Sequence, residues 1–307
     1  MGRYLVRRVL QFIPVFIGAT FLIFALVFMI PGDPIRALSG DKPLPQSVQD
    51  TLRQQYNLDE PLWKQYVLYL GGVAQGDFGE DFRGREVTEI MGDRLPVTAK
   101  LALYAFVFEM IIGVAAGIMA GLKKGGFMDN LVRISTLAVI SIPIFVLGFI
   151  AQLVIGVRFG WLPVSGLREG FMSYIMPAMV LGSVSLAYIA RLTRTSLAEN
   201  MRSDYVRTAT SKGLSRRRVV GVHALRNSLI PVITFLGVDL GALMGGAIIT
   251  EAIFNIPGIG NAVYQATLRQ EGTVVVGIVT FLVLVFMISN LLVDALYAVL
   301  DPRIRYE

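Results

Sequence analysis

The 307-residue chain contains no cysteine and a single histidine, His223. Without cysteine it can form no disulfide, no cysteine metal site and no thiol nucleophile. One histidine leaves little basis for a histidine metal cluster. Charged residues make up 16% of the chain, whereas 54% of its residues are hydrophobic. A typical soluble domain has about 25% charged residues, so this composition directs attention to apolar stretches.

Motifs of common catalytic sites are also missing. The sequence has no G-x-S-x-G, H-E-x-x-H or paired-aspartate motif, which disfavours an intramembrane enzyme. It has no G-x-x-x-x-G-K-[ST] either, so we expect no P-loop and no ATP bound by this chain. We therefore predict that the protein is not itself an enzyme, has no catalytic residues or metal site, and binds no cofactor of its own.

Long apolar stretches dominate what is present. Six of them approach or exceed the roughly 20 residues that a helix needs to cross a bilayer. The first has no A-x-A cleavage site after it, so we interpret it as an uncleaved helix rather than a signal peptide. The sequence predicts an all-α integral membrane protein with about six transmembrane helices, at Val9–Ile30, Val97–Gly121, Val132–Gly156, Met172–Ala190, Leu229–Phe254 and Val274–Leu300.

The net charge of +6 has a topological explanation. An excess of Lys and Arg over Asp and Glu commonly indicates nucleic acid or the cytoplasmic face of a membrane as the partner. Here the basic residues lie near the chain ends and in short loops between apolar stretches, and such loops stay in the cytoplasm. We therefore expect membrane lipid as a partner, no nucleic acid, and both termini in the cytoplasm.

The segment 31–96 falls outside the membrane in this topology. It is acidic on balance, and Gln46–Tyr56 and Leu62–Leu70 within it have helical patterns. We predict a small helical external insertion between the first two transmembrane helices. The chain then divides into an N-terminal tail with the first helix at 1–30, the insertion at 31–96, and a core membrane domain at 97–307.

The densest block of positive charge lies between Arg191 and Asn227, where nine Lys and Arg residues face two acidic ones. Two interpretations fit this pattern. A structured basic loop can be a surface that a soluble partner binds, or an interfacial segment that binds anionic lipid. The pattern alone does not separate the two.

The centre of this block has the signals of a short capped helix. Ser203 or Asp204 can accept a hydrogen bond at its N-terminus, and Tyr205–Lys212 makes about two turns. Gly213 suits the left-handed position that ends a helix. Beyond it, Ser215 can cap a second helix at 216–226. We predict a short helix between two transmembrane helices.

The stretch Asp204–Leu214 resembles the coupling motif of ABC importer permeases, in which a Glu-Ala-Ala triplet precedes a glycine by four positions. Here the triplet is Arg207-Thr208-Ala209 and the glycine is Gly213. The departures from the generic triplet resemble the peptide/nickel branch. Further segments support this resemblance, namely Met29–Pro34, Gly76–Gly79, Arg94–Thr98, His223–Pro231, Thr250–Gly260 and Leu291–Tyr297. The chain is similar to the B-type permease subunit of dipeptide and oligopeptide ABC importers.

That resemblance implies the ABC type I importer permease fold in the inner membrane of a prokaryote. The implied partners are a sister permease that forms a heterodimer, two cytoplasmic ATPases that carry ATP and Mg, and an external substrate-binding protein. The implied coupling helix at about 204–214 contacts an ATPase through Asp204, Tyr205, Arg207, Thr208, Ala209, Lys212, Gly213 and Leu214. Peptides are the expected cargo, while nickel chelates and haem stay open.

Within this assignment the side chains have different expected roles. Arg207 and Lys212 pair with ATPase carboxylates at the rim, and Tyr205, Ala209 and Leu214 pack against the ATPase. Rim charges tune the association rate more than the affinity, so the packing residues should matter more.

Three acidic residues lie inside predicted spans, Glu109, Asp239 and Asp294. A carboxylate at the centre of a membrane helix costs about 2.5–3.5 kcal/mol, so each should face protein or water. Two readings stay open for each, a contact in the transport pathway or a hydrogen bond between helices. The alternative function is a proton-coupled secondary transporter that uses Glu109 and Asp239.

The fifth predicted span offers candidate pathway residues. Gly237, Gly241 and Gly245 recur every fourth residue and so form one stripe on which helices can approach closely. Asp239 points to roughly the opposite side. We take Asp239, Gly241 and Gly245 as candidate pathway residues, together with Glu251, which could contact a peptide amine near the external end.

Overall fold

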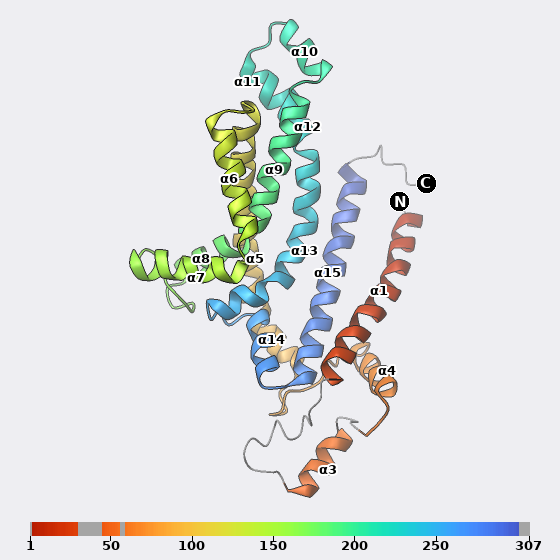
Figure 1. Cartoon of the computed structure of the whole chain (residues 1–307). Coiled ribbons are helices and arrows are strands. Elements are labelled where there is room, and N and C mark those ends of the chain that lie inside the picture. Colours follow the sequence, from red (N-terminus) through yellow and green to blue (C-terminus); the bar gives the residue numbers. More distant parts are fainter. Residues whose placement is uncertain (1, 30–44, 56–58, 301–307) are drawn as a thin grey trace. The chain divides into compact units, whose positions relative to one another are not determined.

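The protein is all helix in the part of the chain that our computed structural model describes, residues 2–29, 45–55 and 59–300 (Figure 1). It divides into two compact units. Unit 1 comprises Met1–Thr98 and Pro257–Glu307, and unit 2 comprises Ala99–Ile256. The expected core domain at 97–307 has different bounds, because in this division α15 groups with α1 and α14, along which it packs.

Unit 1 is built around the pairing of its terminal helices. Its elements are α1 (Gly2–Phe28), α3 (Gln46–Gln55), α4 (Leu62–Val73), the start of α5 (Val87–Leu122), α14 (Ile259–Leu268) and α15 (Gly272–Leu300). Helices α3 and α4 confirm the two helices predicted in the insertion. The buried side chains of Phe24, Tyr66 and Val276 bring α1, α4 and α15 into one apolar cluster.

Two tyrosines of α4 hold it in place. The Tyr66 hydroxyl donates to the Ile17 carbonyl at 2.8 Å, and the Tyr69 hydroxyl donates to the Val276 carbonyl at 3.3 Å. Burial raises the pKa of Tyr69 to about 12, so its hydroxyl stays a donor at neutral pH. The part of the insertion formed by α4 is therefore attached to α1 and α15.

Unit 2 contains the remaining helices. They are the rest of α5, α6 (Phe127–Ser141), α7 (Ile144–Ala151) with the π-helix η1 (Gln152–Arg158), α8 (Met172–Leu181), α9 (Ser183–Asn200), α10 (Asp204–Ser211), α11 (Arg216–Arg218), the π-helix η2 (Val219–Ala224), α12 (Leu225–Ser228) and α13 (Ile230–Ile253). The run from α11 to α12 confirms the helix predicted after Ser215.

Three single helices in the described residues are long and apolar enough to cross a membrane, and three bent helix pairs bring the total to six if each pair is one span. The predicted span Val132–Gly156 corresponds to one of these bent pairs, in which α6 and the α7–η1 pair meet at an angle of 106°. Pro143 has no N–H to continue α6 and holds Ile142 in an extended conformation. Within unit 2, α7 consequently lies across α6 (Figure 1).

A stripe of glycines on α5 lets this helix approach α9 closely. A Cβ added at Gly117 would lie 2.4 Å from the Thr193 Cβ and 2.6 Å from the Ala190 carbonyl oxygen. Gly113 and Gly121, one turn away on either side, are almost as tightly covered by α9. Glycine at every fourth position is a common device for close packing of membrane helices. The α5–α9 pair is thus the closely packed framework of unit 2.

Candidate functional site

The segment 204–214, which we call the coupling segment, is a helix with a fully formed C-terminal cap. Helix α10 ends at Ser211, and Gly213 has φ +77°. The Gly213 N–H donates to the Thr210 carbonyl at 3.0 Å, and the Leu214 N–H donates to the Ala209 carbonyl at 3.4 Å. This pair of bonds is the Schellman motif, and it confirms the left-handed conformation predicted at Gly213.

The N-terminal end of α10 differs from the prediction. Ser203 has the extended backbone of an N-cap residue, but its hydroxyl donates to the Asn200 carbonyl at 2.6 Å instead of accepting from α10. Ser215 precedes α11 in the same extended conformation and makes no side-chain cap bond either. A serine hydroxyl can bond a carbonyl three or four residues back, and at Ser203 this competing bond forms.

One face of α10 is buried within unit 2. Val206 and Ala209 are 4% and 6% exposed, and they pack with Leu197 of α9 and Val219 and Ala224 of η2. The expectation that Ala209 packs against an ATPase is therefore wrong. Its methyl group is covered by its own chain, which leaves no room for a partner side chain.

The opposite face of α10 is exposed. Tyr205, Thr208 and Lys212 recur at spacings of three and four residues, so they lie along one stripe of the helix. Arg207 is exposed as well, and its guanidinium lies 3.7 Å from the Asp204 carboxylate. Both side chains are largely in solvent, so this pair contributes little to stability. The exposed face is polar and cationic, and a rigid apolar base supports it.

The base of the coupling segment also contacts α5. Ile118 and Leu122, in the last turns of α5, pack against the same apolar cluster, and so do Met201 and Leu214. A force on α10 would thus act on α5, α9 and η2 together.

Glu109 and Asp239 lie together at a junction of three helices. The Ser185 hydroxyl of α9 donates to the Asp239 carboxylate of α13 at 2.8 Å. The carboxyl group of Glu109 on α5 is fully buried beside Asp239, and neither of its oxygens has a hydrogen-bond partner among the described residues. It also lies beside Gly182, where α8 and α9 meet. Asp239 therefore makes a hydrogen bond between helices, as one of its two readings expects, whereas both readings of Glu109 stay open.

The other candidate pathway residues are dispersed. Gly241 is buried, whereas Gly245 is exposed and a Cβ added there would touch nothing within 4 Å. Glu251 is fully buried near the C-terminal end of α13, and its contact with a peptide amine stays a prediction. Asp294 lies in α15, but its side chain is outside the described residues. Close glycine packing occurs on α5 instead, and the sequence showed that motif too, at Gly113, Gly117 and Gly121.

Sequence reasoning missed a buried ion pair. Asp129 of α6 is 1% exposed and meets Arg194 of α9, with one Arg194 nitrogen 2.9 Å from the Asp129 carboxylate and a second contact through the guanidinium Nε. The Gly125 N–H donates to the same carboxylate at 2.7 Å. Arg194 is therefore engaged inside the chain and does not belong to the exposed basic surface. The only sign of this ion pair in the sequence was the position of Asp129, three residues before the apolar stretch that begins at Val132.

No metal site is apparent in the described part of the chain, where no group of three or more His, Asp or Glu side chains could hold an ion.

Comparison with known families places this geometry in context. Residues 113–306 match the family described as binding-protein-dependent transport system inner membrane component. Residues 1–102 match the N-terminal region of such membrane components. Together these two matches span almost the whole chain.

Curated relatives align over their full length. The chain is 40% identical to the di/tripeptide transport system permease protein DppB of Pseudomonas aeruginosa, and the alignment covers all of both proteins. It is 37% identical to the dipeptide transport system permease protein DppB of Escherichia coli. It is also 37% identical to the glutathione transport system permease protein GsiC of the same species. Both of these alignments are likewise complete.

Among solved structures, a chain of the MetNI methionine ABC transporter in an inward-facing conformation has the same fold. The TM-score is 0.52 at 18% sequence identity, and the match covers 67% of this chain and 95% of that chain. At this identity the likeness shows the fold alone, and it agrees with the predicted ABC importer permease fold.

Proposed function

The chain belongs to the family of binding-protein-dependent transport system inner membrane components, and on this premise we propose that it carries peptides across the membrane as one half of a permease heterodimer. Its relatives at 37–40% identity are permeases named for dipeptides, di/tripeptides and glutathione. Small peptides are the cargo class that these names share, since glutathione is itself a tripeptide. The chain has no P-loop, so in an ATP-driven importer the ATP would be bound by partner subunits.

The coupling segment is the observation that carries this proposal. An exposed polar stripe through Tyr205, Thr208 and Lys212 stands on an apolar base that reaches α5 and α9. Such a surface suits a soluble partner whose movement must be passed to membrane helices. We assign that partner as one of two cytoplasmic ATPases, with ATP and Mg on the ATPase side. The termini and the coupling segment then lie in the cytoplasm, and an external binding protein delivers the peptide.

The proposed mechanism follows from the contacts of α10. When the ATPases close on ATP, they displace α10, and the shared cluster moves the ends of α9 and α5 with it. The continuous helical run from Arg216 to Ser228 passes the same displacement to α13. The Ser185–Asp239 hydrogen bond ties α13 to α9, and an apolar cluster around Ile189 packs α5 against both, so unit 2 moves as a body. Alternation between inward- and outward-facing states requires such concerted movement.

A reconstitution experiment tests this function. The chain is placed in liposomes with its sister permease, the ATPases and the peptide-loaded binding protein, and uptake of a labelled dipeptide is measured. We expect uptake that requires ATP and continues when a protonophore abolishes the proton gradient. Uptake without ATP that stops with the protonophore would instead establish the proton-coupled alternative.

A further inference from the structure

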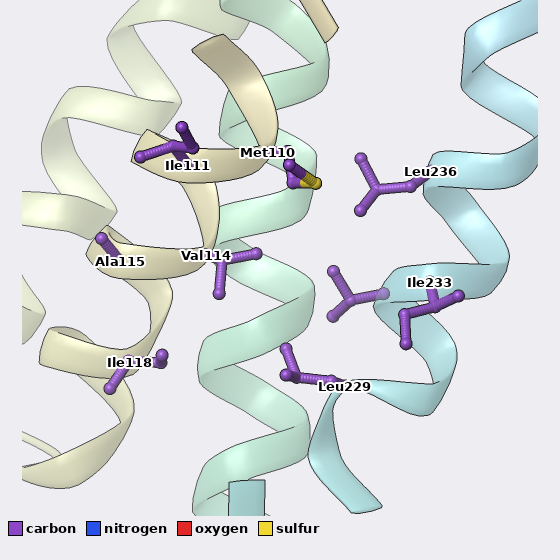
Figure 2. Close-up of a pocket in the computed structure, with 9 residues that line it drawn as sticks. Met110, Ile111, Val114, Ala115, Ile118, Leu229, Ile233 and Leu236 are labelled. Carbon is purple, nitrogen blue, oxygen red and sulfur yellow. The ribbon is translucent and has the colours of Figure 1, made fainter. Parts of the chain in front are cut away.

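An apolar groove separates α5 from α13 within unit 2. It has a volume of about 380 Å³ and is lined by Met110, Val114 and Ile118 of α5, by Val232 and Leu236 of α13, and by Leu229, which directly precedes α13. Figure 2 shows the two sets of side chains on opposite sides of the groove, with another helix behind it. Ile111 and Ile233 are 56% and 50% exposed, so the groove is open along its outer side.

The two ends of the groove differ in chemistry. At one end, Glu109 directly precedes Met110 on α5, and Asp239 lies about one turn beyond Leu236 on α13. The other end lies at Ile118 of α5 and at Leu229, which directly precedes α13 (Figure 2). The groove therefore runs from the level of two acidic residues toward the coupling segment, whose apolar cluster Ile118 contacts.

Exposed cations lie near the Ile118–Leu229 end of the groove. Lys123 and Lys124 directly follow α5, and Arg226 lies one turn before α13. The exposed run Arg216–Arg218 belongs to the same end, because the last turns of α5 and the helix η2 pack on one apolar cluster. No acidic residue occurs between Asp204 and Asp239 in the sequence. An apolar groove thus leads into a cationic rim.

The depth of the groove matches one leaflet of a bilayer. Ile118 lies eight residues from Met110, and Leu229 lies seven residues from Leu236, so at 1.5 Å per residue the groove is about 10–12 Å long. Half of a 30 Å hydrocarbon core is about 15 Å. One acyl chain that enters from the rim would therefore fill it, with its headgroup at the level of the cations.

We propose that this groove is a binding site for one anionic phospholipid, whose acyl chain lies between α5 and α13 and whose phosphate headgroup contacts Arg226 and the lysines at 123–124. The site places the lipid between α5 and α13, close to the base of the coupling segment. It relies on the membrane setting of the chain and is independent of the transported cargo.

Photolabelling in the intact importer complex tests the site. Complexes in phosphatidylcholine nanodiscs receive a trace of phosphatidylglycerol or of phosphatidylcholine, each with a photoreactive acyl chain, and the labelled peptides are identified by mass spectrometry. We expect labels on 110–118 and 229–236 with phosphatidylglycerol, and weaker labelling with phosphatidylcholine. Each cation near a membrane surface changes the affinity for anionic lipid about fivefold, so Arg226→Gln should lower phosphatidylglycerol labelling by about that factor.

Two control variants separate the groove from the general membrane surface. Ala115→Trp fills the groove from an exposed position and should abolish the label, whereas Met119→Trp, exposed on α5 outside the groove, should leave it unchanged. Arg168→Gln removes an exposed cation from the loop before α8 and should have no effect on labelling.

Equal labelling by both lipids, or labelling that survives Ala115→Trp, would overturn the proposal. Crosslinking of a photoreactive residue at Ile111 to the sister permease would overturn it as well, because a protein helix would then occupy the groove. Because the experiment measures lipid labelling and not transport, failure of the lipid site and failure of the proposed transport function can be distinguished.

Discussion

The carboxylate of Asp129 is removed from solvent, and the guanidinium of Arg194 contacts it through two nitrogens. Removal of one partner of a buried ion pair leaves an uncompensated charge, which typically costs about 3–5 kcal/mol. We predict that Asp129→Ala sharply lowers the thermal unfolding midpoint of the detergent-solubilised protein. Asp204→Ala removes the exposed partner of Arg207 and should change stability by less than about 1 kcal/mol. Equal effects of the two variants would contradict this account of α6 and α9.

Gly213 is the second residue whose identity the structure requires. Its φ of +77° lies in the left-handed region, which costs other residues about 1–2 kcal/mol and β-branched residues more. A Cβ there would touch nothing within 4 Å, so the strain is in the backbone alone. We predict that Gly213→Val weakens the Schellman cap and uncouples ATP hydrolysis from uptake, measured together in proteoliposomes. Gly221→Ala, exposed in η2 without such strain, should preserve coupling. Normal coupled transport by Gly213→Val would count against the assigned coupling segment.

Individual residues were partly predictable. The left-handed glycine and the acids in the spans follow from simple rules, because only glycine tolerates positive φ cheaply and a charge in a helix interior needs a partner. The identity of the partner was not predictable, since Ser185 lies 54 positions from Asp239 and no local spacing joins them. Burial of Ala209 was equally invisible, because its cover comes from η2 and α9.

At the scale of helices, positions were easier to predict than directions. Apolar length located the spans, and the two insertion helices appear near their predicted bounds. The bends of 106° and 57° were not predicted. Pro143 is the local cause of the first, since it ends α6, yet the direction of α7 depends on packing against α8 and α13. Proline patterns show where a helix ends but do not show where the chain then goes.

The α5–α9 contact yields a prediction about two glycines. Gly117→Ala places a Cβ 2.4 Å from the Thr193 Cβ, and the two helices must separate to admit it. Overpacking of this kind costs about 1–3 kcal/mol. We predict a lower unfolding midpoint and less monodisperse protein on size-exclusion chromatography. The matched change Gly245→Ala, on exposed α13 surface with nothing within 4 Å, should be neutral. If Gly245→Ala lowered the unfolding midpoint more than Gly117→Ala, the close helix packing would instead belong to the glycine stripe at 237–245.

For the whole molecule, the membrane character and the family were evident from composition, apolar lengths and dispersed motifs. The grouping of residues 257–307 with 1–98 was not, because it depends on α15 meeting α1 at the far end of the chain. Orientation in the membrane and the identity of partners rest on charge distribution and family.

The central claim is that the exposed stripe of α10 contacts an ATPase during transport. Because the natural chain contains no cysteine, a single Thr208→Cys creates a unique crosslinking site on that stripe. Val206→Cys, on the same helix but 4% exposed, is the matched control. In the assembled, transport-competent complex, a short bifunctional crosslinker at position 208 should capture the nucleotide-hydrolysing subunit, and position 206 should not. If position 208 never captures that subunit in a complex that imports peptide, α10 is not the element through which ATP hydrolysis moves these helices.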